Sequence, residues 1–305
     1  MTENQDAPRV GLKLLLKEQS NVVFTKPGAA VSEVTHMSPG MRANAFFFSH
    51  KKWAGKYYDC ENHPGLLSAR WKRATGGWHD KVVVDMGCGP GNLARLGMGR
   101  PKLLVGVDIS EGALEKAAEH GYQTLYADVH STPLKSGIAD LVTANALLHH
   151  IDDVEKVLAE CARLVKPGGM LITDEEPILS QTAFSGLFSW ITKIHSRIPL
   201  SRVKHHPTIK WKYTSRSERI NRLKTEIHFK HPGDGIDLSV FDRVLKPLGF
   251  TVKTYPHAHI AGDEIFNDEK GRRSTLERLA QLAAGLNPDA TDLQLSVMCI
   301  ATRTG

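Results

Sequence analysis

The chain has 305 residues, 41% of them apolar, so it can bury a large core, and either one enlarged domain or a domain with a small cap would account for its length. Its four cysteines are widely scattered without a paired metal spacing, which argues against a disulfide framework and against a zinc site. The net charge of +6 is unevenly spread, since residues 193–231 alone carry +9 and the remainder stands at −3. A basic segment of this kind can meet nucleic acid, an anionic membrane surface or an acidic substrate, or can simply form a solvated face.

The sequence also indicates a compartment. The first six residues are polar and acidic, with no apolar run that would serve as a secretory signal. No stretch approaches the roughly 18 consecutive apolar residues that a membrane span requires. Together with the scattered cysteines, these features predict a cytoplasmic protein with no transmembrane segment and no bound metal.

Residues 82–175 alternate short apolar runs with helical patterns, which predicts strand, turn and helix units that build a parallel sheet. We expect a short helical stretch near residues 92–97, helices at 110–120, 152–164 and 237–245, and an amphipathic helix at 274–284 that packs on the core or forms a dimer contact. The expected strands cover residues 82–84, 103–107, 122–127, 138–144, 170–173, 250–255 and 293–301.

A glycine-rich turn follows the first of these strands, in the run Val84-Asp85-Met86-Gly87-Cys88-Gly89-Pro90-Gly91-Asn92. Glycine permits both the sharp turn from strand to helix and a close approach of the backbone to a ligand. The run lacks the Gly-Lys-Ser/Thr ending of a P-loop, and its third glycine comes too early for the usual dinucleotide fingerprint. By itself this loop would suit any nucleotide-binding α/β protein.

Two more aspartates end the next two expected strands. Asp108 ends the second strand, where its carboxylate can accept hydrogen bonds from both hydroxyls of a ribose. Asp128 ends the third strand, where it could accept from an adenine amino group while the backbone of Val129 reads a ring nitrogen. Each aspartate alone could equally be a turn residue or a helix cap. Together with Asp85, however, they place three carboxylates at consecutive strand ends behind one glycine loop, which indicates a single cofactor site.

In these features the chain resembles the class I S-adenosylmethionine (SAM)-dependent methyltransferases, in particular those that act on small molecules, quinones and lipids. The resemblance implies an α/β fold with a Rossmann-like, seven-stranded, mostly parallel sheet whose last strand is antiparallel. It also implies SAM as the cofactor and S-adenosylhomocysteine as the product. The match spans about a third of the chain, and its segments lie at residues 83–91, 106–110, 127–129, 139–142, 147–151 and 164–169.

The resemblance and the segment lengths together predict three parts. Residues 80–177 and 236–305 would form the SAM-binding domain, and residues 1–79 a helical lid or extension. The aromatic-rich stretch 43–78 would close over SAM with Tyr57 or Tyr58 reaching the cofactor, although its aromatic side chains could instead be simple packing. Residues 178–235 exceed what a crossover needs, so we assign them to an inserted basic cap that covers the acceptor.

The resemblance also assigns parts of the cofactor to residues. It implies that the methionine part lies near Asp85 and Gly87, the ribose on Asp108 and the adenine beside Asp128. Asn145, after the fourth strand, would lie near the methionine part and face the acceptor. The full set of expected cofactor-binding residues is Asp85, Met86, Gly87, Cys88, Gly89, Asn92, Asp108, Ile109, Asp128, Val129, Asn145 and Tyr57.

Methyl transfer is an in-line displacement, so the enzyme mainly aligns the nucleophile and excludes water, and a hydroxyl nucleophile also benefits from a base. His149 and His150 follow the fourth strand, close to the expected acceptor, and histidine titrates near neutrality. One of them could be the base, or the pair could pack structurally. Glu175, with Glu176 beside it, ends the fifth strand and could orient the acceptor or merely cap a helix.

We therefore expect a methyltransferase for a small-molecule acceptor, anionic or aromatic, with oxygen as the first choice of methylated atom and nitrogen as the second. The protein would be a monomer or a homodimer. A nucleic-acid methyltransferase is the main alternative because the cap mixes cations with aromatics, but Asn145-Ala146-Leu147-Leu148 lacks the Asn-Pro-Pro-aromatic motif. A membrane-surface quinone or lipid methyltransferase would use an apolar helical face at residues 184–194. A non-catalytic SAM-binding protein finds no positive support.

Overall fold

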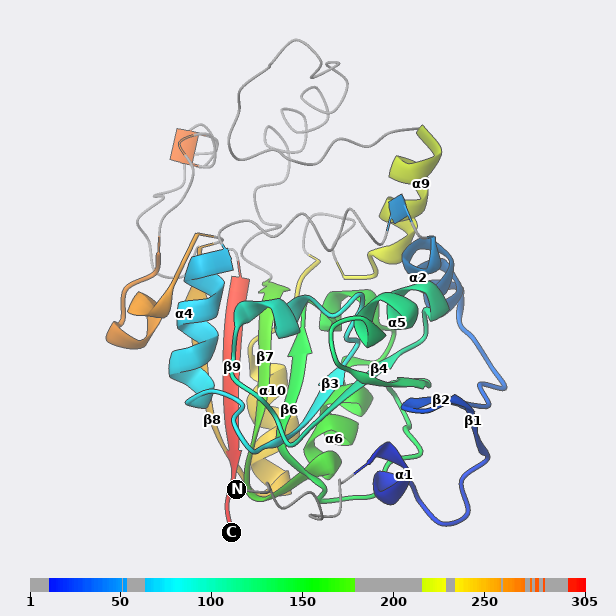
Figure 1. Cartoon of the computed structure of the whole chain (residues 1–305). Coiled ribbons are helices and arrows are strands. Elements are labelled where there is room, and N and C mark those ends of the chain that lie inside the picture. The colour runs from blue at the N-terminus through cyan, green and yellow to red at the C-terminus, as the bar shows by residue number, and fades with distance from the viewer. Residues whose placement is uncertain are drawn as a thin grey trace, which may run out of the picture.

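One twisted sheet with helices on both faces forms the framework of the protein (Figure 1). Within the part of the chain that the structure describes, the sheet holds nine strands in the order β1-β2-β5-β4-β3-β6-β7-β9-β8. The computed structural model describes residues 11–50, 52–53, 64–178, 216–228, 234–258, 260–271, 275, 278–279, 282 and 296–305.

The five central strands are parallel and carry the motifs of the sequence. The strand order reverses at β3, which pairs with β4 on one side and with β6 on the other. In open α/β sheets, ligands bind beyond the carboxyl ends of the strands at such a reversal. The strands are β3 (Val82–Met86), β4 (Leu103–Asp108), β5 (Gln123–Tyr126), β6 (Ala139–Asn145) and β7 (Val165–Pro177).

The last strand of the chain inserts antiparallel between two others. β9 (Ser296–Arg303) pairs antiparallel with β7 on one side and with β8 (Phe250–His257) on the other. The expected α/β, mostly parallel sheet with an antiparallel last strand is therefore confirmed.

The N-terminal part adds two strands that the sequence analysis missed. β1 (Val22–Lys26) and β2 (Ala29–Ser32) form a hairpin, and β2 runs parallel to β5, so the sheet has nine strands rather than seven. The hairpin turns at Gly28, whose φ of +76° lies in the left-handed region, between runs of β-branched and small apolar residues. The N-terminal part, expected to be a helical lid or extension, thus also contains two strands.

Two hydrophobic cores lie on the two faces of the sheet. One face packs against α1 (Leu12–Leu15), α6 (Val154–Leu164) and α10 (Ser239–Leu245). The other packs against η1 (Asn92–Leu96), α4 (Pro64–Thr75), α5 (Glu111–Ala118) and η5 (Asp263–Asn267), around Trp71 and Trp78. Side chains alternate between the faces along a strand, so Val82 and Val84 join the first core and Val83 joins the second.

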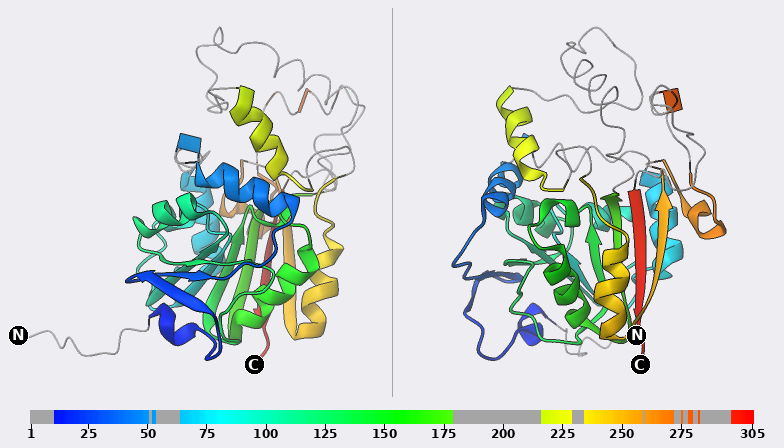
Figure 2. Two further views of the ribbon diagram at one scale, coloured as in Figure 1. Left: turned by 90° about the vertical axis from the view of Figure 1, so that its right-hand side faces the viewer. Right: turned by 180° about the vertical axis from the view of Figure 1, so that it is seen from behind.

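Two further helices lie over the carboxyl edge of the sheet. α2 (Pro39–Ser49) and α9 (Arg216–Thr225) lie side by side at the end of the molecule opposite the C-terminus (Figures 1 and 2). α2 begins at Ser38, whose side chain accepts a hydrogen bond from the backbone N–H of Met41, and Pro39 suits the first turn of a helix. The helices therefore come from the two segments assigned to lid and cap.

The structure describes only parts of the expected cap and of the expected amphipathic helix at residues 274–284. Residues 179–215 and 229–233, which hold most of the expected cap and its apolar 184–194 face, lie outside the described residues. Leu279, expected to pack on the core or to form a dimer contact, is 57% exposed, which contradicts the first of these alternatives. Within the described ranges, no helix is long and apolar enough to cross a membrane.

Candidate active site

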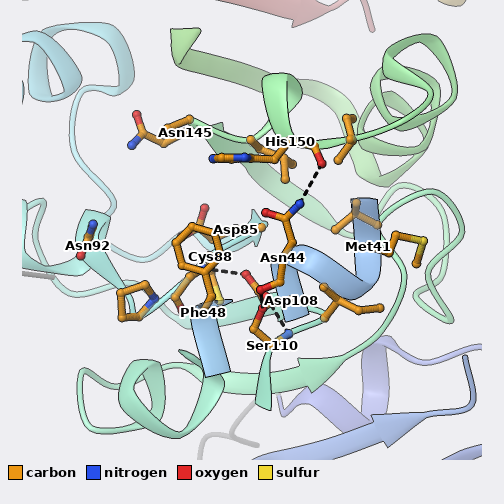
Figure 3. A pocket seen from close by; sticks show the side chains of 18 of the residues that line it. Met41, Asn44, Phe48, Asp85, Cys88, Asn92, Asp108, Ser110, Asn145 and His150 are labelled. Carbon is orange, nitrogen blue, oxygen red and sulfur yellow. Dashed lines mark hydrogen bonds between the residues drawn. The ribbon is translucent and has the colours of Figure 1, made fainter. Parts of the chain in front are cut away.

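A pocket opens beyond the carboxyl ends of β3, β4 and β6, beneath α2 (Figure 3). Its volume is about 930 Å³ when the open mouth is included. The residues that line it are Met41, Asn44, Phe48, Asp85, Gly87, Cys88, Gly89, Pro90, Asn92, Leu93, Asp108, Ile109, Ser110, Asp128, Val129, His130, Asn145, Ala146, Leu147, His150 and Ile151.

The glycine loop forms one wall of the pocket with bare backbone. Gly87 has a φ of +65°, and a Cβ placed there would lie 2.4 Å from Cδ1 of Leu147. Gly89 has a φ of +53°, and no described atom lies within 4 Å of the position its Cβ would take. Glycine is therefore needed at the first position for space, while the second leaves room beside the backbone for a ligand.

Asp85 lies at the base of the pocket and is almost completely buried. Its Oδ2 accepts a hydrogen bond from the Tyr122 hydroxyl and its Oδ1 accepts one from the Thr143 hydroxyl, each over 2.8 Å. Burial raises the pKa of Asp85 to about 7, against the lowering effect of the two hydroxyls. A nearby cation would favour the ionised form of this carboxyl.

Asp108 is held by backbone groups on both of its oxygens. Its Oδ2 accepts from the N–H of Gly89 at 2.9 Å and its Oδ1 accepts from the N–H of Ser110 at 2.8 Å. Burial raises its pKa, although these hydrogen bonds act in the opposite direction. Each carboxylate oxygen has more than one acceptor site, so both can still accept from a pair of vicinal hydroxyls.

Asp128 lies on the same side of the pocket, half-exposed. Its Oδ1 accepts from the backbone N–H of His130 at 2.9 Å and lies 2.7 Å from Nδ1 of the same histidine. Partial burial opposes ionisation, but the hydrogen bonds from His130 lower the pKa of Asp128 overall. The other oxygen of Asp128 is thus left for a donor in the pocket.

Two asparagine side chains bring unsatisfied oxygens to the pocket. Among the described residues, neither Oδ1 of Asn92 nor Oδ1 of Asn145 has a hydrogen-bond partner, although both atoms are buried. A buried amide oxygen without a donor is unfavourable, so each calls for a ligand or water that donates to it. The ammonium and hydroxyl groups of SAM are donors of this kind.

α2 covers the pocket and is tied to the elements beneath it. The side-chain Nδ2 of Asn44 donates to the backbone oxygens of Gly40 at 3.0 Å and of both His150 and Thr225 at 3.2 Å. A Cβ at Gly112 would lie 2.3 Å from the backbone oxygen of Ser49, so the far end of α2 also packs closely on α5. α2 is therefore in contact with η2 (Leu148–His150), the turn that follows β6, and with α5 and α9.

His150 is the one of the two predicted histidines that lines the pocket (Figure 3). Its Nδ1 lies 2.9 Å from the backbone oxygen of Thr225. A carbonyl oxygen can only accept, so Nδ1 carries the proton and Nε2 of a neutral ring is an acceptor. Burial and then the neighbouring His149 lower the pKa of His150 to about 3, so the ring is neutral at physiological pH.

His149 lies behind its neighbour, outside the pocket lining, with ring centroids 4.1 Å apart. Its Nδ1 lies 2.8 Å from Oε2 of Glu176, which is fully buried. Burial lowers the pKa of His149, but the charge and the hydrogen bond of Glu176 raise it by more than burial lowers it. The pKa of His149 is therefore raised overall. His149 therefore contacts a pocket-lining residue, His150, but does not itself line the pocket.

Glu175 does not reach the pocket lining either. Its Oε1 lies 2.5 Å from Nη2 of Arg70, whose Nε pairs with Asp174 at 2.9 Å. The backbone of Glu175 has a φ of +57°, which is uncommon for a residue other than glycine. The carboxylate of Glu175, which was a candidate for orienting the acceptor, is thus ion-paired with Arg70 on α4.

The structure gathers most of the residues expected to bind the cofactor into one cavity. Met86 is the exception among the described ones, because strand alternation places its buried side chain on the face of Val82 and Val84. Tyr57 lies outside the described residues. The sequence analysis missed Asn44, since nothing in a helix with three phenylalanines marks one asparagine as the residue that contacts η2 and α9.

Comparisons with known proteins agree with this site. A family profile described as a methyltransferase domain matches residues 84–173. An uncharacterized methyltransferase of Mycobacterium tuberculosis is 31% identical over 171 residues, which is 54% of this chain and 85% of that protein. A ubiquinone biosynthesis O-methyltransferase of Thiobacillus denitrificans is 37% identical over 110 residues, which is 34% of this chain and 47% of that enzyme.

Among solved structures, phosphoethanolamine N-methyltransferase 2 of Haemonchus contortus in complex with SAM has a TM-score of 0.52. It is 15% identical, with 89% of this chain and 61% of that chain covered, so it supports the fold alone. The mycobacterial relative, in contrast, is matched over most of its length at a higher identity. The chain therefore belongs to the class I SAM-dependent methyltransferases, and SAM is its cofactor.

Proposed function

We propose that this enzyme methylates a small molecule at an oxygen atom, with nitrogen as the second choice. The observation that carries the proposal is the placement of His150, which lines the pocket and whose Nδ1–H donates to the backbone oxygen of Thr225, so that Nε2 is the acceptor atom of its ring. A hydroxyl acceptor has a proton to lose, whereas a neutral amine already has a free electron pair. The name of the Thiobacillus relative, an O-methyltransferase, supports the same choice.

We infer the position of SAM from the acceptors that surround the pocket. Asp108 would bind the ribose hydroxyls, and Asp128 with the backbone of Val129 would bind the adenine edge. Asp85 and the free oxygen of Asn145 would face the methionine part, whose ammonium group is a donor. These assignments leave the His150 side of the pocket for the acceptor.

SAM supplies a methyl group on a sulfonium, which is transferred by in-line displacement. For that reaction, the residues of this chain align the acceptor and keep water out. α2 would exclude water, because Met41, Asn44 and Phe48 lie over the cavity. Nε2 of His150 would accept the hydrogen bond of the acceptor hydroxyl and take its proton as the new oxygen–carbon bond forms.

We also propose that the chain is divided into a lid, a cap and a SAM-binding domain. The contacts of α2 support a lid within residues 1–79, and those of Thr225 support a cap within residues 178–235 that reaches the acceptor side. The domain between them, residues 80–177 and 236–305, would bind SAM. A cap of this kind explains how one fold can hold an acceptor that the SAM-binding strands do not contact.

The acceptor class can be tested with methyl-labelled SAM and fractionated cell extract. Purified enzyme is incubated with a small-molecule fraction, total RNA, total protein, and vesicles of extracted lipid, and the label in each is counted. We expect label in the small-molecule fraction, in a product whose methyl group is bonded to oxygen by mass and NMR spectra. Label confined to RNA, protein or vesicles would contradict the proposal.

A further inference from the structure

A buried group of charges lies directly behind His150, outside the pocket lining. Glu176, at the end of β7, accepts hydrogen bonds from the backbone N–H groups of Leu147 at 2.7 Å and Leu148 at 2.8 Å through Oε1. Its Oε2 accepts from the backbone N–H of His149 at 3.1 Å and lies 2.8 Å from Nδ1 of the same residue. One carboxylate thus fixes the whole turn that presents the two histidines.

Glu226 approaches the same histidines from the opposite side. It follows the last residue of α9, within the inserted segment, and its side chain is 8% exposed. Its Oε1 pairs with Arg222. Its Oε2 is buried and has no hydrogen-bond partner among the described residues, yet it lies 3.7 Å from Nε2 of His149 and 3.9 Å from Nδ1 of His150. A buried carboxylate oxygen without a donor is costly unless it serves a nearby positive charge.

The backbone brings Glu226 to this place. The N–H groups of Ile227 and His228 both donate to the carbonyl oxygen of His149, at 2.9 and 3.1 Å. Thr225 accepts from Nδ1 of His150, as described above. His228 itself turns away, with its Nε2 3.0 Å from the carbonyl oxygen of Ile151. The segment after α9 is therefore paired with the histidine turn on both sides of Glu226.

We propose that Glu226 is a positioning residue for His150, and that its carboxylate is the counter-charge for the proton that His150 takes from the acceptor. The inference rests on the proposed function of the pocket. In the reaction, the acceptor proton moves to Nε2 of His150 and the oxygen electron pair forms the bond to the methyl carbon. The electron pair of the sulfur–methyl bond stays with sulfur, giving S-adenosylhomocysteine, and the proton then passes from His150 to water.

The surrounding charges show why His150 needs such a counter-charge. Burial and the adjacent His149 both lower the pKa of His150, and Arg222 acts in the same direction. Glu226 is the charged neighbour that opposes them, since Glu176 is occupied by His149. Burial raises the pKa of Glu226, but the charges of its neighbours, Arg222 and His149 among them, and the hydrogen bond from Arg222 outweigh burial, so the pKa is lowered and the carboxylate is ionised at neutral pH. Without Glu226, the remaining charged neighbours that act on the pKa of His150 would be His149 and Arg222, which both lower it.

A divalent metal ion is the rival occupant, since ligand atoms of His149, His150 and Glu226 all lie within 4.8 Å of one another. Two contacts favour a proton on His150 over a metal ion at this place. Nδ1 of His150 already donates to Thr225, and Arg222 already pairs with Glu226. A metal ligand atom must be deprotonated, so a metal ion bound by Nδ1 of His150, the ring nitrogen that lies 3.9 Å from Glu226, would break the first of these contacts.

The first test reads the histidines directly, by NMR of the full chain labelled with ¹⁵N-histidine. The variants are Glu226→Gln and, as a matched control, Glu155→Gln, an exposed glutamate that pairs with Arg243 on α6 and α10. His149→Gln and His150→Gln assign the signals. We expect His150 neutral with the proton on Nδ1 at pH 7, and a titration midpoint of His149 that falls by about one unit in Glu226→Gln only. Identical titrations in both variants, or stoichiometric zinc in the purified protein, would overturn the inference.

The second test measures the rate of label transfer from SAM into the small-molecule fraction. Glu226→Gln should lower the maximal rate about ten-fold or more while the KM for SAM stays within about two-fold, and Glu226→Asp should restore part of the rate. Thermal unfolding checks that each variant folds. A wild-type rate in Glu226→Gln would overturn this inference and leave the proposed function intact. If no fraction accepts label, the proposed function fails, and the NMR titration still decides whether Glu226 controls the histidines.

Discussion

Gly87 shows how one missing side chain shapes the cofactor pocket. A Cβ there would meet Leu147 at 2.4 Å, whereas Gly137 has the same φ of +65° and no described atom within 4 Å of its Cβ position. We expect Gly137→Ala to lower the free energy of unfolding by about 1–2 kcal/mol, through backbone strain alone. Gly87→Ala should lower it by about 2–4 kcal/mol, because overpacking adds to the same strain. Urea unfolding of the two variants measures the difference, and equal losses would contradict the steric role of Leu147.

Asp85 should link SAM binding to pH. Its pKa of about 7 means that the ligand-free protein holds a proton on this carboxyl below neutrality, whereas the cationic groups of SAM favour the carboxylate. Binding then releases a proton, so SAM affinity should rise with pH from about 5.5 to about 7, by at most ten-fold per unit, and level off above that. Calorimetry in buffers of different ionisation enthalpy detects the proton. Affinity that does not change over this range would exclude the link, and Asp85→Asn should remove it.

At this scale, local sequence patterns predicted the cofactor side of the pocket better than the acceptor side. Asp85, Asp108 and Asp128 could be placed together because strand ends in a parallel sheet share one edge. Asn44 could not be placed with its partners in this way, because His150 and Thr225 lie 106 and 181 residues further along the chain. Contacts over such separations depend on tertiary packing, which no local period encodes.

Among the elements, α2 is the one whose position controls access to the pocket. Asn44→Ala would leave the carbonyl oxygens of His150 and Thr225 without this donor. We expect the free energy of unfolding to fall by about 1–3 kcal/mol and SAM to dissociate several-fold faster, as measured by stopped-flow fluorescence. Asn221→Ala on α9 is the matched control, because among the described residues that side chain bonds within its own helix, to Ser217. Equal dissociation rates in the two variants would argue against α2 as a lid.

The fold elements themselves were largely predictable, with one instructive failure. The expected helix at 152–164 became α6, capped by Asp153, and the expected strands at 103–107 and 138–144 became β4 and β6. Long apolar periods and capping residues specify such elements locally. The β1–β2 hairpin was missed because β1 is mostly exposed and short, so it shows no buried period. Its place in the sheet comes from the pairing of β2 with β5.

For the molecule as a whole, Arg70 joins three distant regions of the chain. The side chain lies on α4, is 1% exposed, and bonds to Asp174 and Glu175 at the end of β7 and to the backbone oxygen of Ala261. His257 completes the group, with Nε2 3.1 Å from Asp174. Because Arg70 and Asp174 are buried, removing Arg70 would leave the charge of Asp174 buried and without this partner, which is costly.

Arg70→Ala should therefore lower the free energy of unfolding by about 3–5 kcal/mol. Arg73→Ala, three residues later on the same helix, removes an exposed ion pair with Asp263 and should cost under about 1 kcal/mol. Thermal and urea unfolding of the two variants provide the comparison. Similar losses in both would show that the buried group does not hold the N-terminal extension to the sheet.

The measurement that tests the account most directly is calorimetric SAM binding to the wild type and to Asp108→Ala. Asp237→Ala, an exposed carboxylate before α10, is the control, and thermal unfolding confirms that each variant is folded. We predict one SAM per chain, with unchanged affinity in the control and binding weaker by about 1–3 kcal/mol in Asp108→Ala, because the ribose hydroxyls lose a charged acceptor. An unchanged affinity in a folded Asp108→Ala protein would contradict the placement of SAM in this pocket.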